Sequence, residues 1–152
     1  MFVFIPVAIV CSLALAALVV KRVPAGQVYS LYRRGKPVCL LQPGTHMVLP
    51  LLERVGHRID LGGRVLRFEE PMADAGGLRG TVYWQVLEPE RADAVIEQAD
   101  QLIRRGAVEA LQGKVEAVAD QRALGQQLKQ SLNGLLRPRG VMVTRVELDL
   151  AA

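Results

Sequence analysis

The sequence predicts an α+β domain, with a mainly antiparallel sheet and two to three helices, behind one apolar N-terminal helix. Three observations support this fold class. The first twenty residues carry no charge, the following stretch alternates like strands, and the later stretch has helical periodicity before a closing strand. Strands followed by helices are typical of α+β domains, whereas strict alternation of the two is typical of parallel sheets. Residues 21–150 have the size of one small domain.

The apolar start, MFVFIPVAIVCSLALAALVV, is long enough to cross a bilayer if it is helical throughout. Twenty residues at about 1.5 Å each give roughly 30 Å, the thickness of the hydrocarbon core. We therefore predict a transmembrane helix over residues 1–20. A cleaved signal peptide is the alternative, which the missing basic n-region disfavours. The predicted membrane-anchor residues are Phe2, Phe4, Ile5, Val7, Ile9, Leu13, Leu15, Leu18 and Val20.

The charges behind this run predict its orientation. Every charged residue before Glu53 is basic, and the set is Lys21, Arg22, Arg33, Arg34 and Lys36. The positive-inside rule then places the N-terminus outside and the domain in the cytoplasm. The opposite topology, with the domain on the outer face, is the alternative. We expect the five basic side chains to contact lipid headgroups.

Strand signals fill the first half of the domain. Five segments have β-prone composition or period-two alternation: 28–33, 46–52, 54–60, 64–68 and 80–87. Val82, Trp84 and Val86 share one face of the clearest of them. A last strand is expected over 141–150, with Met142, Val146, Leu148 and Leu150 on its buried face.

Helix signals fill the second half. Pro89 suits a first helical turn, and Val95, Ala99, Leu102 and Ile103 share one helical face. Alternatively, Asp100 caps a new helix that ends near Gly113. A further helix is predicted from Asp120, with a leucine stripe that Pro138 and Gly140 terminate. Core packing is the favoured role of the stripe, and a partner or self-association face made of Leu124, Leu128, Leu132 and Leu135 is the alternative.

An apolar cluster directly follows the turn signal Pro43-Gly44. It consists of Met47, Leu49, Pro50, Leu51 and Leu52. Because Pro50 interrupts any strand ladder, these side chains are available to an apolar phase beside the anchor. The alternative is that they fill the core of the domain. The residues leave both interpretations open.

The motifs of catalysis and of metal binding are missing from the sequence. His46 and His57 have no cysteine or carboxylate cluster at metal-ligand spacing. Ser30 and Ser131 lack the Gly-x-Ser-x-Gly setting of a nucleophile. We therefore predict a protein that is not an enzyme and has no cofactor. The basic residues beyond Lys36 are dispersed, which disfavours a nucleic-acid partner.

The order of the segments resembles the stomatin/prohibitin/flotillin superfamily, whose shared module is the SPFH or band 7 domain. The likeness rests on VPAGQ (23–27), QPGTHMVLPLLERV (42–55), VYWQV (82–86), DQRALGQQL (120–128) and PRGVMVTRVELDL (138–150). It is greatest to the bacterial stomatin-like proteins of the QmcA type. The resemblance implies a bacterial inner-membrane scaffold that organises membrane patches, with residues 47–52 beside the leaflet. It also implies homo-oligomers, and as partners membrane lipids, an FtsH-type protease or an NfeD-type protein.

One departure from the family concerns assembly. Family members continue into a long coiled coil that drives ring or cage formation, whereas this sequence has no heptads after its closing strand. The expected oligomer size is therefore open. A small monomeric or dimeric membrane adaptor that binds a single partner is the alternative to a laterally associating scaffold.

Overall fold

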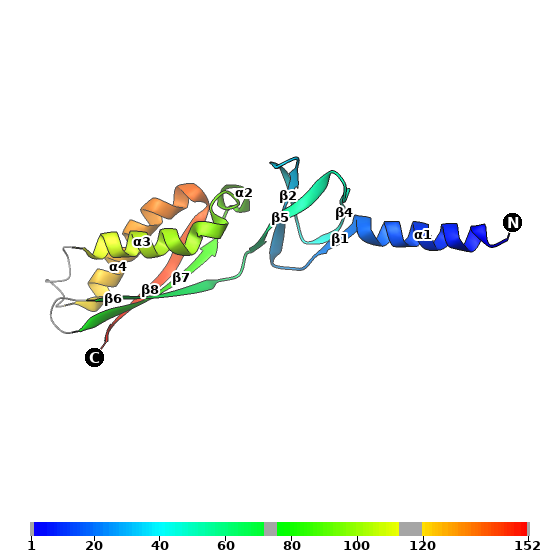
Figure 1. The fold of residues 1–152 in the computed structure, drawn as a ribbon. Coiled ribbons are helices and arrows are strands. Elements are labelled where there is room, and N and C mark those ends of the chain that lie inside the picture. Colours follow the sequence, from blue (N-terminus) through cyan, green and yellow to red (C-terminus); the bar gives the residue numbers. More distant parts are fainter. Residues whose placement is uncertain (1, 72–75, 113–119, 152) are drawn as a thin grey trace. The chain divides into compact units, whose positions relative to one another are not determined.

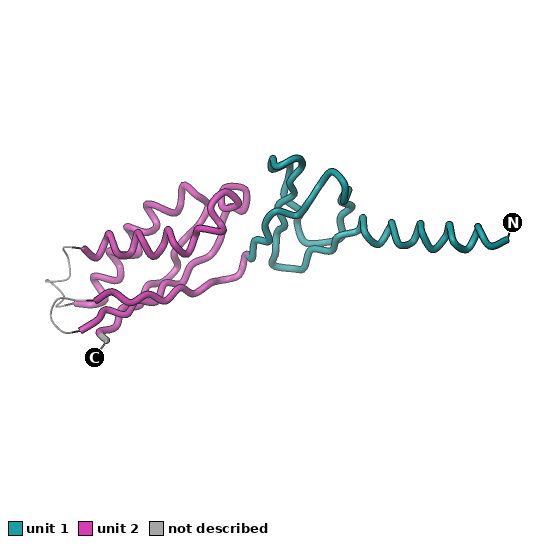
Figure 2. Tube along the Cα trace, in the orientation of Figure 1, with its two compact units in different colours: residues 1–60 teal, residues 61–152 magenta. Residues whose placement is uncertain are grey.

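A computed structural model describes residues 2–71, 76–112 and 120–151 of the chain (Figure 1). The chain forms two compact units, residues 1–60 and 61–152 (Figure 2). Helices and strands are segregated along the sequence and every strand pair is antiparallel, which confirms the α+β class. The strands are divided among three small sheets.

The N-terminal apolar run forms a shorter helix than predicted, and the predicted transmembrane helix is wrong. Helix α1 spans Phe4–Val19, and its 16 residues extend only about 24 Å. The last residue of the run, Val20, already belongs to strand β1 (Val20–Val23), where it pairs with Met47. In the described ranges, none of the helices joins the length to the apolar character that crossing a membrane requires. The predicted orientation, with the N-terminus outside, depended on a membrane-spanning helix and therefore loses its basis.

Two small sheets form the rest of the first unit. Strand β1 pairs with β4 (Gly44–Met47) in a two-stranded ribbon. Strand β2 (Gln27–Arg33) lies between β3 (Lys36–Leu41) and β5 (Glu53–Asp60). As the central strand, β2 is buried on both faces over residues 28–31. The core between the ribbon and the sheet consists of Val23, Tyr29, Leu31, Leu41 and Val48.

The second unit is a three-stranded sheet with helices on one side (Figure 1). Strand β7 (Gly77–Val86) lies between β6 (Arg64–Pro71) and β8 (Val141–Ala151). Helix α3 (Ala99–Leu111) contacts β6, and helix α4 (Gln121–Leu136) packs along β8. The predicted face of β7 is confirmed, because Val82, Trp84 and Val86 are all buried.

The stretch before α3 is broken into short elements. Helix α2 (Pro89–Ala92) is followed by a one-turn 3-10 helix, η1 (Ile96–Gln98), and α3 begins at Ala99. A separate helix therefore begins close to Asp100, as the alternative predicted. The predicted cap is wrong, because Gln98 is the N-cap residue and Asp100 lies in the first turn of α3. The predicted end near Gly113 lies outside the described residues, and α3 ends at Leu111.

Helix α4 begins where the sequence predicted. The carboxylate of Asp120 accepts hydrogen bonds from the backbone N–H groups of Arg122, at 3.0 Å, and Ala123, at 3.4 Å. This cap satisfies two N–H groups that have no partner within the helix. After α4 comes a single 3-10 turn, η3 (Arg137–Arg139), and Gly140 then takes a left-handed φ of 77°.

The predicted buried face of the closing strand is wrong in its first half. A bulge shifts the register between Tyr83 and Trp84, so that Tyr83 pairs with Arg145 while Trp84 pairs with Val143. Thr144 is the extra residue, and its hydroxyl donates to the Tyr83 carbonyl at 3.1 Å. Because side chains alternate with period two, the extra residue exchanges the faces. Val141 and Val143 are therefore buried in place of Met142. Of the later predicted residues, Leu148 is buried, Val146 is half-buried and Leu150 is 54% exposed.

Candidate membrane-contacting surface

The apolar cluster after Pro43-Gly44 lies at the surface of the first unit. Met47 is 80% exposed and Leu51 is 97% exposed, while Leu49 and Leu52 are about half exposed. Only Val48, which the sequence analysis did not single out, turns into the core. The alternative that this cluster fills the core therefore applies to one side chain of the segment. The others form an exposed apolar turn, which we define as residues 49–52 with Met47 beside it.

Backbone hydrogen bonds fix the shape of the apolar turn. The Leu49 carbonyl accepts from the N–H groups of Leu52, at 3.1 Å, and Glu53, at 2.8 Å. In return, the Glu53 carboxylate accepts from the Leu49 N–H at 3.3 Å. Pro50 fits here because a proline at the start of such a turn needs no N–H partner. The turn therefore holds Leu51 at its apex with few open backbone groups.

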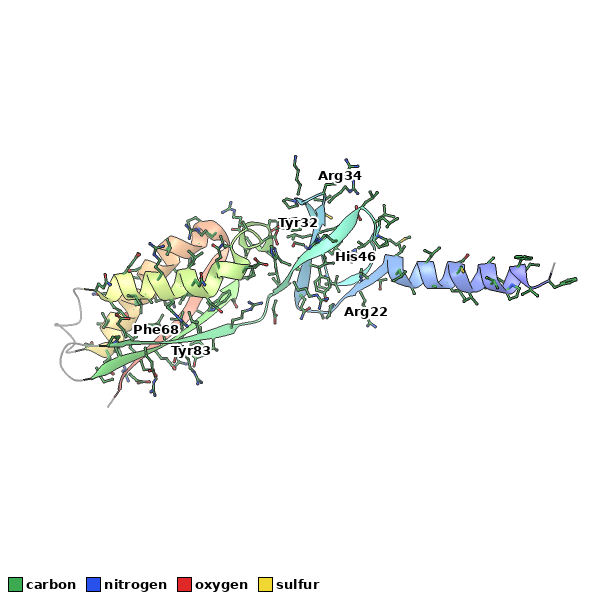
Figure 3. The ribbon with its side chains drawn as sticks, in the orientation of Figure 1. Arg22, Tyr32, Arg34, His46, Phe68 and Tyr83 are labelled. Atoms are coloured by element: carbon green, nitrogen blue, oxygen red, sulfur yellow. The ribbon has the colours of Figure 1, made fainter. Side chains whose placement is uncertain are left out.

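A basic hairpin tip lies next to the apolar turn. The tip, residues 33–36, joins β2 to β3, and Arg33 pairs across the sheet with Glu53 of β5. The Arg33 guanidinium also forms an ion pair with the Glu53 carboxylate. Arg34 and Gly35 adopt left-handed backbone conformations that close the hairpin, and Arg34 is labelled in Figure 3. Basic and apolar side chains from separate parts of the sequence are thus adjacent.

The ion pair lowers the pKa of Glu53. The hydrogen bond from Arg33 has the largest effect, followed by the hydrogen bond from the Leu49 N–H. Both interactions favour the charged carboxylate. Sequence reasoning missed Glu53, because a proline turn followed by an acidic residue is a weak local signal and its partner lies twenty residues away.

The apolar turn is hydrogen-bonded to the end of α1 through the ribbon. The Val48 N–H donates to the Val19 carbonyl at 2.8 Å. Next to this bond, Val20 pairs with Met47 and Lys21 pairs with His46. Arg22 and His46 are labelled in Figure 3. The end of the apolar helix, two basic residues of β1 and the apolar turn are therefore neighbours within the first unit.

Helix α1 exposes apolar side chains on every side. None of its residues is buried, and it has no acidic residue in its first turn and no basic residue in its last. A helix that is apolar all round is stable in water only when something covers it. The nine predicted anchor residues are all exposed: Phe2, Phe4, Ile5, Val7, Ile9, Leu13, Leu15, Leu18 and Val20.

The leucine stripe of α4 lies inside the second unit. Leu124, Leu128 and Leu132 are buried, as the favoured core-packing interpretation required. Leu135, at 40% exposed, is the only one of the four proposed interface residues that lies at the surface. Three of the four are therefore unavailable to a partner while the helix stays packed on the sheet.

His46, His57 and Ser30 are each engaged in a contact with a neighbouring strand or turn residue. The ring Nε2 of His46 is hydrogen-bonded to the Gln42 carbonyl at 2.7 Å, and the ring of His57 packs edge-on against Tyr32. Ser30 accepts a hydrogen bond from the His57 backbone N–H at 2.9 Å. Among the residues described, no three histidine, cysteine or acidic side chains gather in a way that could hold a metal ion.

The fold and this surface define a class of protein: a small α+β module preceded by an exposed apolar helix, with basic and apolar groups beside the helix end. The chain belongs to the SPFH domain / Band 7 family, whose pattern it matches over residues 21–150. Members of this family are membrane-associated scaffolds and are generally not enzymes. The resemblance expected from the sequence is confirmed at the level of the superfamily.

Proposed function

We propose that this protein is a non-enzymatic scaffold that binds a lipid surface with its first unit and associates laterally with copies of itself. The observation that supports lipid contact most directly is the exposure of the whole apolar surface of α1 beside an exposed apolar turn. Burial of one leucine in an apolar phase is worth about 1.5 to 3 kcal/mol. Together these side chains outweigh the cost of immobilising one small domain at a membrane.

The basic side chains support an anionic lipid surface. Lys21 and Arg22 lie at the base of α1, and Arg34 and Lys36 lie at the hairpin tip beside the apolar turn. Each adds about 1 kcal/mol when it lies near an anionic bilayer. Arg33 is engaged with Glu53, so we assign it to shaping the turn and not to headgroup contact. We place the protein at the anionic face of the bacterial inner membrane.

The finer assignments of this proposal rest on family resemblance alone. They are the kinship with stomatin-like proteins of the QmcA type and the partnership with an FtsH-type protease or an NfeD-type protein. Lateral association of the domains would bring such partners together in one membrane patch. The size of the assembly in lipid is the quantity that tests this part.

Vesicle flotation of the full chain tests the lipid contact. We expect co-flotation with vesicles that contain anionic lipid and weaker co-flotation with neutral ones. The double variant Ile9→Asp/Leu13→Asp should lose most of the binding. In that weakened background, Leu49→Asp should lower it further, whereas Leu87→Asp should not. Leu49 and Leu87 are matched, since they are 51% and 50% exposed, but Leu87 lies in the second unit.

Mass photometry of the protein in native lipid nanodiscs tests the lateral association. A discrete multimer is the expected result. A monomer or dimer that retains vesicle binding would contradict the scaffold and select the small adaptor. Equal flotation of the wild-type chain and the Ile9→Asp/Leu13→Asp variant would contradict the lipid contact itself.

A further inference from the structure

Arg34 adopts a backbone conformation that arginine rarely takes. Its φ is 52°, and among the described residues it is the only residue other than glycine with a positive φ. In this left-handed region an L side chain lies too close to the following carbonyl oxygen, so that the region is left mostly to glycine, asparagine and aspartate. Arg34 therefore makes the hairpin less stable than a residue suited to the turn would.

The hairpin itself imposes this conformation. Arg33 pairs with Lys36, and the loop between β2 and β3 consists of Arg34 and Gly35 alone. Both loop residues have a positive φ, 52° and 77°, as in a type I′ turn. The sequence that such a loop favours most is Asn-Gly, and Gly35 already follows this preference. Folding alone would therefore favour asparagine where the chain has Arg34.

The guanidinium of Arg34 has no role within the chain. Arg34 is exposed at the hairpin tip (Figure 3), and in the part of the chain that the structure describes its side chain has no ion pair or hydrogen bond. Arg33, by contrast, forms the ion pair with Glu53. The only other acid of the first unit, Asp60, lies at the far end of β5. The Arg34 guanidinium is thus available to a ligand from outside the chain.

The charge around the hairpin tip favours an anion. Residues 1–60 contain seven basic and two acidic side chains, whereas residues 61–152 contain twelve basic and thirteen acidic ones. The net charges are therefore +5 and −1. The exposed apolar turn lies next to the tip, because Glu53 bonds both Arg33 of the tip and the Leu49 N–H of the turn. A ligand that is anionic and joined to an apolar phase fits both features.

We propose that Arg34 is the residue that gives this protein a preference for anionic over neutral lipid headgroups. Its guanidinium would donate two parallel hydrogen bonds to the phosphate oxygens, a geometry that arginine matches and lysine does not. In a neutral headgroup, a cationic group already neutralises the phosphate. Strained residues are frequent at ligand-binding sites, where binding and not folding explains them. The inference rests on the lipid contact proposed for the first unit and assigns the specificity of that contact to one side chain.

Replacement of Arg34 by asparagine should have opposite effects on stability and on binding. In nanodiscs of neutral lipid, Arg34→Asn should raise the hydrogen-exchange protection of the β2, β3 and β5 amides about fivefold, because backbone strain is removed. In the Ile9→Asp/Leu13→Asp background, it should lower the affinity for phosphatidylglycerol vesicles about fivefold, because one charge is lost at the bilayer surface. The affinity for neutral phosphatidylcholine vesicles should stay the same.

Lys36→Asn is the matched control for strain. Lys36 has the same charge at the same tip and is exposed like Arg34, but its φ is not positive. Lys36→Asn should therefore leave the protection without any gain. It should weaken binding to the anionic vesicles only about twofold, since lysine offers phosphate a point charge without the guanidinium fork. Arg122→Asn, at an exposed position of the second unit, should change neither quantity.

The side-chain N–H signal of Arg34 in NMR spectra distinguishes a lipid phosphate from free phosphate. The signal should shift when phosphatidylglycerol replaces neutral lipid around the full chain, and not when millimolar inorganic phosphate is added to the neutral nanodisc. A shift with inorganic phosphate alone would overturn the assignment to lipid.

Two results with Arg34→Asn would contradict the inference while the wild-type chain still floats with anionic vesicles. They are an unchanged preference for these vesicles and a lack of any gain in protection. A wild-type chain that does not float at all would instead contradict the lipid contact on which the inference rests.

Discussion

The two units use apolar side chains in opposite ways. In the described residues, sixteen large apolar side chains are exposed in the first unit, against four in the second. The second unit instead buries its apolar positions between one face of a sheet and two helices. Net stability in water comes from burial, so the second unit contains the elements of an ordinary folded core. The first unit keeps a small core and leaves a large apolar area for something else to cover.

A hydrophobic pattern predicts burial within the chain only when it selects one face of an element. Amphipathic periodicity, as in α4, specifies one face and therefore a packing partner within the chain. A continuous apolar run, as in α1, specifies no face and predicts only that water is a poor solvent for it. The same contrast predicts which substitutions change folding and which change surface binding.

The largest expected effect on folding is at Leu132 of α4, and Leu135 of the same helix serves as its comparison. Leu132→Ala should destabilise the second unit by about 2 to 5 kcal/mol, because it opens a cavity in a closed core. Leu135→Ala should cost less than about 1 kcal/mol, since Leu135 is 40% exposed. Urea unfolding followed by Trp84 fluorescence measures both, as Trp84 is the only tryptophan and lies in this core. Equal costs would mean that the core does not extend to Leu132.

One glycine from each unit has a left-handed backbone conformation but a different packing environment. Gly26 and Gly140 have nearly the same left-handed φ, 80° and 77°. A Cβ on Gly26 would meet nothing within 4 Å, whereas one on Gly140 would collide with the Glu88 carbonyl oxygen. Gly26→Ala should therefore cost about 1 to 2 kcal/mol from backbone strain alone. Gly140→Ala should cost about 3 kcal/mol or more, because the backbone around Glu88 must also move.

Hydrogen exchange measures how each glycine substitution changes amide protection, separately in each unit. The expected result is a larger loss of protection in residues 76–112 for Gly140→Ala than in residues 27–60 for Gly26→Ala. Gly134→Ala is the control, since Gly134 lies in a helix with open space at its Cβ position. This change should stabilise α4 slightly, by up to about 1 kcal/mol. Similar costs at Gly26 and Gly140 would contradict the close packing of Gly140.

The parts of the fold that local patterns determine were predictable from the sequence. The cap at Asp120, the leucine stripe of α4 and the buried face of β7 each depend on residues within one element. The superfamily was predictable as well, because its segments occur in order along the chain. The exposure of Leu51 was one of two open alternatives, and the structure decided between them.

The parts that depend on distant residues were not predictable. The bulge at Thr144 exists because of how β8 pairs with β7, and it exchanged the predicted faces of the strand. Val20 leaves the helix because it pairs with Met47, so that no count of apolar residues gives the true helix length. The neighbourhood of Arg33 and the apolar turn likewise requires the pairing of β2 with β5.

A smaller effect is expected at Ser30 in the first unit. The pairing of β2 with β5 is irregular between Tyr29 and Leu31, and the Ser30 hydroxyl accepts from the His57 N–H there at 2.9 Å. Ser30→Ala removes this acceptor from a buried site and should cost about 1 to 3 kcal/mol. Ser131→Ala, at an exposed site on α4, should change stability by less than about 0.5 kcal/mol. Thermal unfolding followed by circular dichroism gives both values, and equal costs would contradict a structural role of the hydroxyl.

The smallest expected effect is the pH dependence of the apolar turn. Arg33 and the Leu49 N–H lower the pKa of Glu53 below its ordinary value of 4.5. A group whose pKa is lower in the folded state stabilises that state above the unfolded pKa, and the gain is lost as the pH falls through the folded pKa. The turn should therefore loosen only under acidic conditions, at pH values below the ordinary pKa of a glutamate.

Carboxyl-carbon NMR of Glu53 should give a lowered pKa that moves back toward 4.5 in Arg33→Ala. Arg34→Ala should leave it nearly unchanged, since Arg33 and the Leu49 N–H are the groups that lower the pKa. An ordinary pKa in the wild-type chain would mean that the ion pair does not hold the turn. Leu51 would then be presented by the backbone bonds to Leu49 alone, and the first unit would keep its exposed apolar turn at acidic pH.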